Sequence, residues 1–220
     1  MASVFVNFAN FTTVYSVMLG ILALVLYFKG RRLTRVFCIY LSVAASIDLV
    51  ACSFAESGMN NLVFFHLFTF MELGLLGVFF SHVLKRFKVR FNIMDVILPF
   101  LAMIILNSFF VQSIDSFSTY STTAVSIAII VGCIFTFLKI LDDGSDHDNK
   151  VIRWFLSGLF IYHMGSVVVL LTADLLLQLD TEVQVIIWII RTFVVLLSKI
   201  LFTSGILLEA KYLKKTPSYG

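Results

Sequence analysis

Residues 62–84 read LVFFHLFTFMELGLLGVFFSHVL, a long apolar run with few polar side chains. A helix needs about 20 mostly apolar residues to cross a hydrocarbon core about 30 Å thick, because each residue adds about 1.5 Å. The run is long enough to cross, and its one acidic residue, Glu72, stands near its middle. The sequence therefore predicts a transmembrane helix with a carboxylate inside it.

Similar apolar runs lie on both sides of this one. The other predicted spans are residues 8–28, 34–55, 93–111, 119–141, 151–177 and 183–208. The composition agrees, since 60% of the residues are hydrophobic and 13% are charged, whereas a soluble domain carries about 25% charged residues. We predict an all-α fold, a polytopic membrane protein built as a bundle of seven transmembrane helices. Residues 1–210 form this single domain and residues 211–220 form a short cytoplasmic tail.

Lysine and arginine occur in alternate connections between the predicted spans. The first, third and fifth connections and the tail carry Lys29, Arg31, Arg32, Arg35, Lys85, Arg86, Lys88, Arg90, Lys139, Lys150, Arg153, Lys211, Lys214 and Lys215. The other connections carry only acidic charges, namely Glu56, Asp115, Asp180 and Glu182. Because basic residues accumulate on the cytoplasmic side of a membrane, we predict that the N-terminus lies outside and the C-terminus lies in the cytoplasm.

Ionisable residues within the spans are the first candidates for function, because each costs at least about 2.5 to 3.5 kcal/mol near the bilayer centre. Counting residues inward places Asp48 and Arg191 about 10 Å below the outer edge at about 1.5 Å per residue. Glu72 and His163 come near the midplane, and Lys199 lies in the inner half. The spans therefore bury charge at several depths.

Helical spacing groups polar residues on one face of three predicted helices. The groups are His66, Thr69 and Glu72; His163, Ser166 and Asp174; and Gln184, Trp188, Thr192 and Lys199, with Arg191 on the flank. Polar faces turn away from lipid, so we expect an interior polar cluster that is open towards the outside. The candidate ligand-binding residues are Asp48, Asn61, His66, Glu72, Tyr162, His163, Ser166, Arg191 and Lys199.

Several of these residues also have purely structural interpretations. Arg191 paired with Asp48 or with Glu72 would form a buried ion pair that fixes helix packing, and the long side chain of Lys199 could extend to the inner boundary. The cysteines, which are Cys38, Cys52 and Cys133, fit as small apolar fillers. The acidic segment 142–148 fails the calcium-loop template, so we interpret it as a solvated turn with Asp148 capping the sixth helix.

The sequence predicts no cofactor and no catalytic residue, but a zinc ion and retinal are two cofactors that seven-helix membrane proteins hold. Seven-helix zinc hydrolases carry paired histidines on the last helix, where this chain has none. Lys199 with Glu72 as counter-ion resembles the layout of microbial rhodopsins, but Val195 stands where an acidic residue is expected and Trp154 and Trp188 lie near helix ends. Retinal or a metal ion is therefore a lesser alternative, and an enzyme is not the favoured interpretation.

A faint internal similarity allows a parallel repeat of three plus one plus three helices. Arg35-Val36-Phe37 matches Arg153-Trp154-Phe155, and Thr69-Phe70 matches Thr192-Phe193. The length, the span count and the orientation resemble small sugar transporters of the SWEET type. The likeness stops at topology, because those transporters carry proline motifs and the spans here contain only Pro99.

A second likeness rests on two strings of residues. These are Asn60-Asn61, His66 and Glu72, and then Trp154-Phe155 with Gly158-Leu159-Phe160-Ile161-Tyr162. They resemble small seven-helix integral membrane proteins of unknown function from Bacteroidota. The resemblance implies a shared constellation of Asn61, His66, Glu72 and Tyr162, and it implies Asn at the position of Lys199. We accordingly expect the bacterial inner membrane as the location.

The sequence favours a sensor or receptor that binds a small molecule, a lipid or a proton in the outward-facing polar cluster. Because the connections are too short for a separate domain, its output would pass to a signalling partner at the basic loops. The alternative is a small-solute transporter or channel built from the parallel repeat. The net charge of +3 reflects topology, so the predicted surroundings are the lipid bilayer and no nucleic acid.

Overall fold

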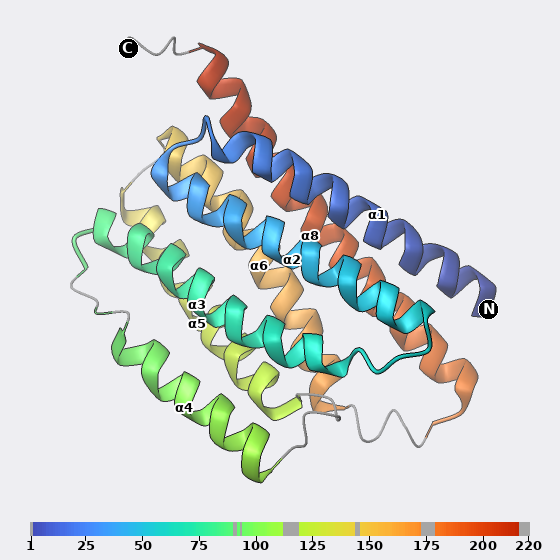
Figure 1. Cartoon of the computed structure of the whole chain (residues 1–220). Helices are drawn as coiled ribbons and strands as arrows, with labels where there is room; N and C mark the ends of the chain where they lie inside the picture. The colour runs from blue at the N-terminus through green and yellow to red at the C-terminus, as the bar shows by residue number, and fades with distance from the viewer. Residues whose placement is uncertain are drawn as a thin grey trace.

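The computed structural model describes residues 2–89, 92, 94–111, 119–143, 146–172 and 179–215. These residues form seven α-helices: α1 (Ala2–Tyr27), α2 (Arg32–Glu56), α3 (Leu62–Arg86), α4 (Met94–Phe110), α5 (Thr119–Asp143), α6 (His147–Leu171) and α8 (Thr181–Lys215) (Figure 1). The predicted all-α fold with seven helices is thereby confirmed. Six of the helices are long and apolar enough to cross a membrane, whereas α4 is shorter, with its apolar stretch over Asp95–Asn107. The chain is therefore an integral membrane protein with several spans.

Six of the helices close into a ring. Around the ring, α1 packs on α2, α2 on α3, α3 on α5, α5 on α6, α6 on α8 and α8 on α1. The shorter helix α4 packs on α3 and α5 and lies at the margin of the bundle (Figure 1). The ring therefore has an interior that side chains of six helices can share.

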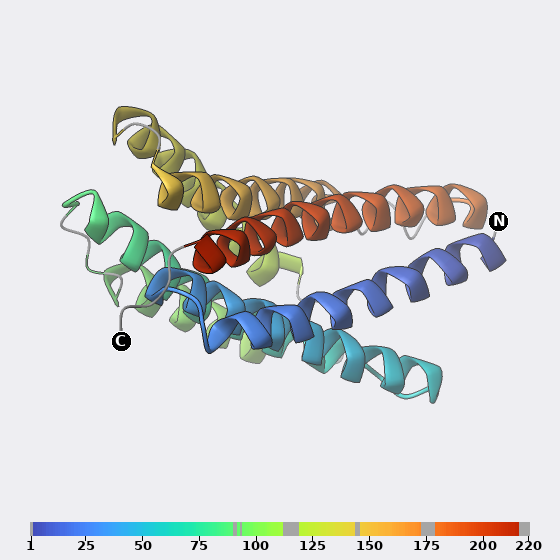
Figure 2. The same ribbon diagram turned by 90° about the horizontal axis from the view of Figure 1, so that it is seen from above.

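Successive helices alternate in direction, so the two ends of the bundle differ in charge (Figures 1 and 2). Lys29 and Arg31 between α1 and α2, and Lys85 and Arg86 at the end of α3, lie at one end, which we call the basic end. The N-terminus and the connection between α2 and α3 lie at the other end, which we call the N-terminal end. The basic connections thus gather on one side of the bundle, as the predicted topology requires.

Large apolar side chains cover the outside of the bundle. On α1, for example, Phe11, Met18, Ile21 and Leu24 are exposed. In water an apolar surface of this extent would promote aggregation, whereas in a bilayer it contacts lipid tails. The surface agrees with a lipid environment.

The aromatic core lies in the half of the ring nearest the basic end. Phe37 of α2 stacks on Phe155 of α6, with ring centroids 4.1 Å apart and ring planes 15° apart. Phe79 of α3 and Phe202 of α8 also pack on Phe37, each with its centroid 5.2 Å away. All four rings are buried, so this core joins α2, α3, α6 and α8.

Candidate functional site

A buried polar cluster, the Glu72 cluster, lies in the ring beyond the aromatic core. It consists of Tyr40, Glu72, Ser126 and His163. The Tyr40 hydroxyl donates to Glu72 Oε1 at 3.1 Å, and His163 Nε2 lies 3.7 Å from the same oxygen. His163 Nδ1 shares a hydrogen bond of 3.1 Å with the Ser126 hydroxyl. Glu72 and His163 are fully buried, so this contact is enclosed by the helices around it.

A second group, the Asp48 cluster, joins three helices through Asp48, Ser16 and Lys199. Asp48 Oδ2 on α2 accepts a hydrogen bond from Ser16 on α1 at 2.8 Å and another from Lys199 Nζ on α8 at 3.2 Å. The hydroxyls of Tyr15 and Thr203 share a further hydrogen bond of 2.8 Å between α1 and α8. Lys199 is thus held by Asp48 and does not extend to the basic end.

Arg191 does not form the ion pair that the sequence analysis considered. Its guanidinium lies over the Trp188 ring, 5.3 Å from the centroid, while Lys199 takes the place beside Asp48. Of the interpretations that the sequence left open, the ion pair of Arg191 is not formed. Equal counts from helix ends do not give equal depths here, because α8 has 35 residues and is longer than its neighbours.

Buried side chains inside the ring are concentrated near the basic end, and side chains towards the N-terminal end are more exposed. Asp48 follows Phe37 by eleven residues, about three turns, and so lies on the same interior face of α2, yet 48% of its side chain is exposed. On α8 the buried residues begin at Ser198, and Arg191, about two turns earlier on that face, is partly exposed. On α6 the last buried residue is Ser166. Figure 2 shows α2 and α8 close together at the basic end and far apart at the other end.

The two clusters share helix α2 of the ring, which carries Tyr40 of one and Asp48 of the other. Tyr162 on α6 packs edge-on against His163, with ring centroids 4.9 Å apart. Six of the candidate residues, which lie on α2, α3, α6 and α8, make up what we call the polar region; they are Asp48, Glu72, Tyr162, His163, Arg191 and Lys199.

Three further candidate residues are Asn61, His66 and Ser166. Asn61 donates to the Ala51 carbonyl oxygen at 3.2 Å and so holds the connection between α2 and α3. His66 is buried on α3, and Ser166 is buried on α6 about one turn beyond His163. Asp174, which the sequence placed on the face of His163, lies outside the described residues.

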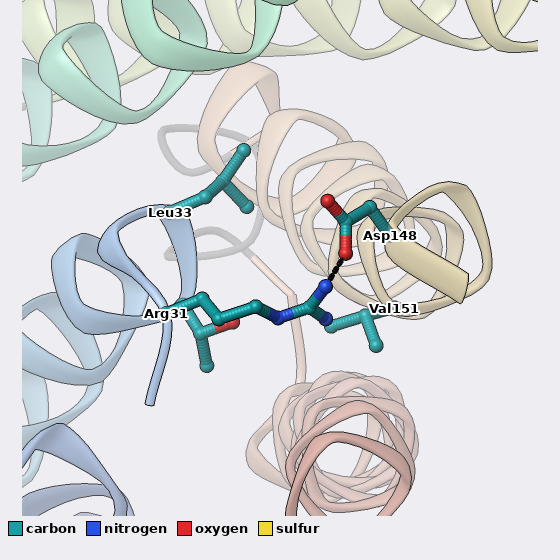
Figure 3. Close-up of a pocket in the computed structure, with 5 residues that line it drawn as sticks. Arg31, Leu33, Asp148 and Val151 are labelled. Carbon is teal, nitrogen blue, oxygen red and sulfur yellow. Dashed lines mark ion pairs between the residues drawn. The ribbon is translucent and has the colours of Figure 1, made fainter. Parts of the chain in front are cut away.

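A network of ion pairs, the basic-end network, joins four helices at the basic end. Arg31 donates from Nε to Glu209 Oε1 at 2.9 Å and also pairs with Asp148 (Figure 3). Arg86 Nη1 at the end of α3 lies 2.9 Å from Asp148 Oδ2, and Arg86 pairs with Asp146 as well. The hydrogen bonds to Glu209 raise the pKa of Arg31 above its ordinary value, so the pair is charged at neutral pH.

A small pocket lies beside this network. Its volume is about 20 Å³, and its walls are Arg31, Leu33, Thr34, Asp148 and Val151 (Figure 3). That volume holds about one water molecule. The basic end is therefore a closed, charged contact between helices.

The basic-end network was not predicted from the sequence. The acidic segment was expected to form a solvated turn with Asp148 as the cap of the sixth helix. Asp146 is the cap instead, and its side chain accepts a hydrogen bond from the Asn149 backbone N–H at 2.7 Å. Asp148 faces Arg31 and Arg86 instead. The available signal was the placement of an acidic segment among otherwise basic connections.

Within the described residues, no three His, Cys, Asp or Glu side chains lie close enough together to hold a metal ion. Cys38 and Cys133 are fully buried, Cys52 is partly buried, and all three are free thiols. The candidate site is therefore the polar region itself.

The fold and the site define a polytopic membrane protein of seven helices with a polar region inside its ring. The chain matches no family model, no curated protein sequence and no solved structure. The likeness to the seven-helix proteins of Bacteroidota accordingly stays a prediction. The function must be argued from the geometry.

Proposed function

We propose that the chain is a carrier that moves a small solute between the N-terminal end and the basic end. The sequence alone favoured the receptor, whereas this proposal favours the transporter. The observation that supports it is the pattern of ion pairs at the basic end, which fits a correspondence of α1, α2 and α3 with α5, α6 and α8.

The motifs that suggested a repeat meet inside the ring. Phe37 and Phe155 occupy matching positions in their motifs, and they stack on each other, as residues on a two-fold axis would. Phe79 and Phe202 each follow their motif threonine by ten residues, and both lie in the same aromatic core, 5.2 Å from Phe37. The matching positions of the two motifs are therefore brought together in one place.

The basic-end network obeys the same exchange with the charges reversed. Arg31 at the start of α2 pairs with Glu209 on α8, while Asp148 at the start of α6 pairs with Arg86 on α3. Arg31 and Asp148 then pair with each other. The two halves thus meet through equivalent contacts, which is the arrangement that lets one half of a repeat transporter rock against the other.

The accessibility of the polar region supports a direction of access. Asp48 is half exposed, whereas the ion pairs of the basic-end network join four helices at the opposite end. With the predicted topology, we interpret this as an outward-facing state. Rocking of the two halves would separate Arg31 from Glu209 and Asp148 and would open the polar region to the cytoplasm.

Uptake by proteoliposomes tests the carrier. The purified full chain is reconstituted and given a panel of labelled amino acids, sugars and organic acids. We expect saturable uptake of at least one class. No uptake of any panel member, together with stabilisation of the protein by one of them, would contradict the carrier and support the receptor.

Cross-linking supplies the matched control. In a background without native cysteines, Arg32→Cys on α2 and Lys211→Cys on α8 are combined, since both side chains are exposed near the network. A reducible cross-linker between them should stop uptake, and reduction should restore it. The single variants should keep their uptake after the same treatment.

A further inference from the structure

We infer that the Asp48 cluster binds the two charged groups of a small zwitterion, with an ammonium at Asp48 and a carboxylate at Lys199. The inference rests on the proposed carrier, because it names the class of solute that the polar region takes. It requires that a solute can reach both Asp48 and Lys199, and that a zwitterion binds to them more favourably than a simple ion does.

Asp48 and Lys199 are placed where a solute can reach them. They face each other from α2 and α8 at 3.2 Å, in the part of the ring interior where side chains are more exposed. Asp48 has 48% of its side chain exposed and Lys199 has 13%. Ser16 on α1 donates to Asp48 Oδ2 at 2.8 Å and so fixes the carboxylate group.

Charge balance selects a zwitterion. A buried charge is tolerated only when it is paired. A simple cation bound to Asp48 would take the carboxylate away from Lys199. A simple anion bound to Lys199 would take the ammonium away from Asp48. A zwitterion replaces the protein ion pair with two new ion pairs and leaves the net charge in the membrane unchanged.

The surrounding charges agree with a neutral solute. Arg191 and Lys199 supply two positive groups to the polar region, and Asp48 and Glu72 supply two carboxyl groups. Arg191 lies on the interior face of α8 towards the N-terminal end, and it is held over the Trp188 ring at 5.3 Å. A carboxylate that enters from that end meets Arg191 before it meets Lys199.

Binding measurements on the full chain in phosphatidylglycerol nanodiscs test the inference. The probes are the twenty common amino acids and γ-aminobutyrate, read by calorimetry and by thermal stabilisation. The best binder is then compared with two matched analogues, one without the carboxylate and one without the ammonium; for L-alanine these are ethylamine and propionate. We expect a dissociation constant at least tenfold lower for the zwitterion than for either analogue.

Variants identify the protein groups involved. Asp48→Asn and Lys199→Gln should each weaken zwitterion binding at least tenfold. Asp95→Asn on α4 and Lys139→Gln on α5 are the matched controls, since neither residue belongs to the polar region, and they should bind as the unaltered chain does. The double variant Asp48→Asn with Lys199→Gln has no unpaired charge, so it should fold even if a single variant does not, and it should not bind.

A zwitterionic lipid headgroup carries the same two charged groups. Nanodiscs made with phosphatidylethanolamine distinguish the two sources. Competition between this lipid and the free amino acid, seen in the unaltered chain and lost in the double variant, would identify the lipid as an occupant of the cluster. Amino-acid binding that is equal in both lipids would identify the free solute.

Two results would overturn the inference. One is that no zwitterion binds in either lipid, and the other is that binding survives in the double variant. Neither result contradicts the carrier itself. The carrier would still be supported if the unaltered chain and the double variant took up a sugar or an organic acid at equal rates. Conversely, zwitterion binding without uptake would keep the inference and contradict the carrier.

Discussion

Glu209 is a carboxylate with no exposed surface, whereas its partner Arg31 keeps 34% of its side chain exposed. Removing the guanidinium leaves a buried charge that keeps only weak partners among the described residues, namely the Arg31 backbone N–H and His147 Nε2, each at 3.4 Å. Removing the carboxylate leaves Arg31 with Asp148 and with water. Because breaking a buried pair costs most when the buried member keeps its charge, we expect Arg31→Gln to destabilise the fold by about 3 to 5 kcal/mol and Glu209→Gln to cost less.

Unfolding of the two variants in mixed micelles measures this asymmetry. The double variant Arg31→Gln with Glu209→Gln should be more stable than Arg31→Gln alone, since it contains no uncompensated charge. Equal losses in the two single variants would mean that burial of Glu209 does not decide the energy of the pair.

Tyr40 gives a second prediction at the scale of one atom. Tyr40→Phe removes the hydroxyl that donates to Glu72 Oε1 at 3.1 Å and leaves a buried acceptor without that donor, so we expect a loss of about 1 to 3 kcal/mol. Tyr15→Phe is the matched control, because its hydroxyl bonds to Thr203 in a half-buried place. It should cost less in the same unfolding measurement, and a larger loss at Tyr15 would contradict the importance assigned to the Glu72 cluster.

At the scale of helices, the sequence predicted what depends on local composition. The apolar runs predicted all seven helices, because each run must satisfy its own backbone hydrogen bonds in lipid. The end of the last helix was harder, and α8 continues past the predicted span end at residue 208 to Lys215. That extension carries charge, so hydropathy alone gives no sign of it.

Close packing of α6 against α8 depends on two glycines. A β-carbon at Gly158 would lie 2.4 Å from the Phe202 ring and 3.0 Å from the Ser198 carbonyl oxygen, and one at Gly205 would lie 2.5 Å from the Phe155 ring. We expect Gly158→Ala and Gly205→Ala each to cost about 1 to 3 kcal/mol through overpacking.

Gly74 provides the matched control for these substitutions, because nothing lies within 4 Å of a β-carbon placed there. Gly74→Ala should stabilise α3 by up to about 1 kcal/mol, since alanine is the better helix former. Thermal unfolding of the three variants in one detergent checks the contrast. A loss at Gly74 as large as at Gly158 would show that the effect comes from helix propensity and not from the α6–α8 contact.

At the scale of the whole molecule, the ion pairs between helices could not be predicted from the sequence. Spacing along one helix predicted interior faces for Glu72 and His163, and both side chains are buried. Which charge meets which depends on how the ring closes, and so Lys199, rather than Arg191, pairs with Asp48. The same reason hides the contact of Asp148 with Arg31, because its partner lies more than a hundred residues away in the chain.

The position of α4 decides which side of the membrane the C-terminus occupies. α3 ends at the basic end and α5 begins at the N-terminal end (Figure 1), so the chain must return between them. α4 has 17 residues, about 25 Å at 1.5 Å per residue, and a shortfall of this size is accommodated by local thinning of the bilayer. With α4 as a seventh crossing, the distribution of basic connections predicts that the C-terminus lies in the cytoplasm.

Cysteine labelling in intact cells tests this topology. In a background without native cysteines, we expect Ser57→Cys, in the connection between α2 and α3, to react with an impermeant maleimide. Lys214→Cys should react only after permeabilisation, because five crossings separate the two positions. Labelling of both in intact cells, or of neither, would place them on the same side. It would remove α4 as a crossing, and with it the parallel orientation of the two halves on which the proposed carrier depends.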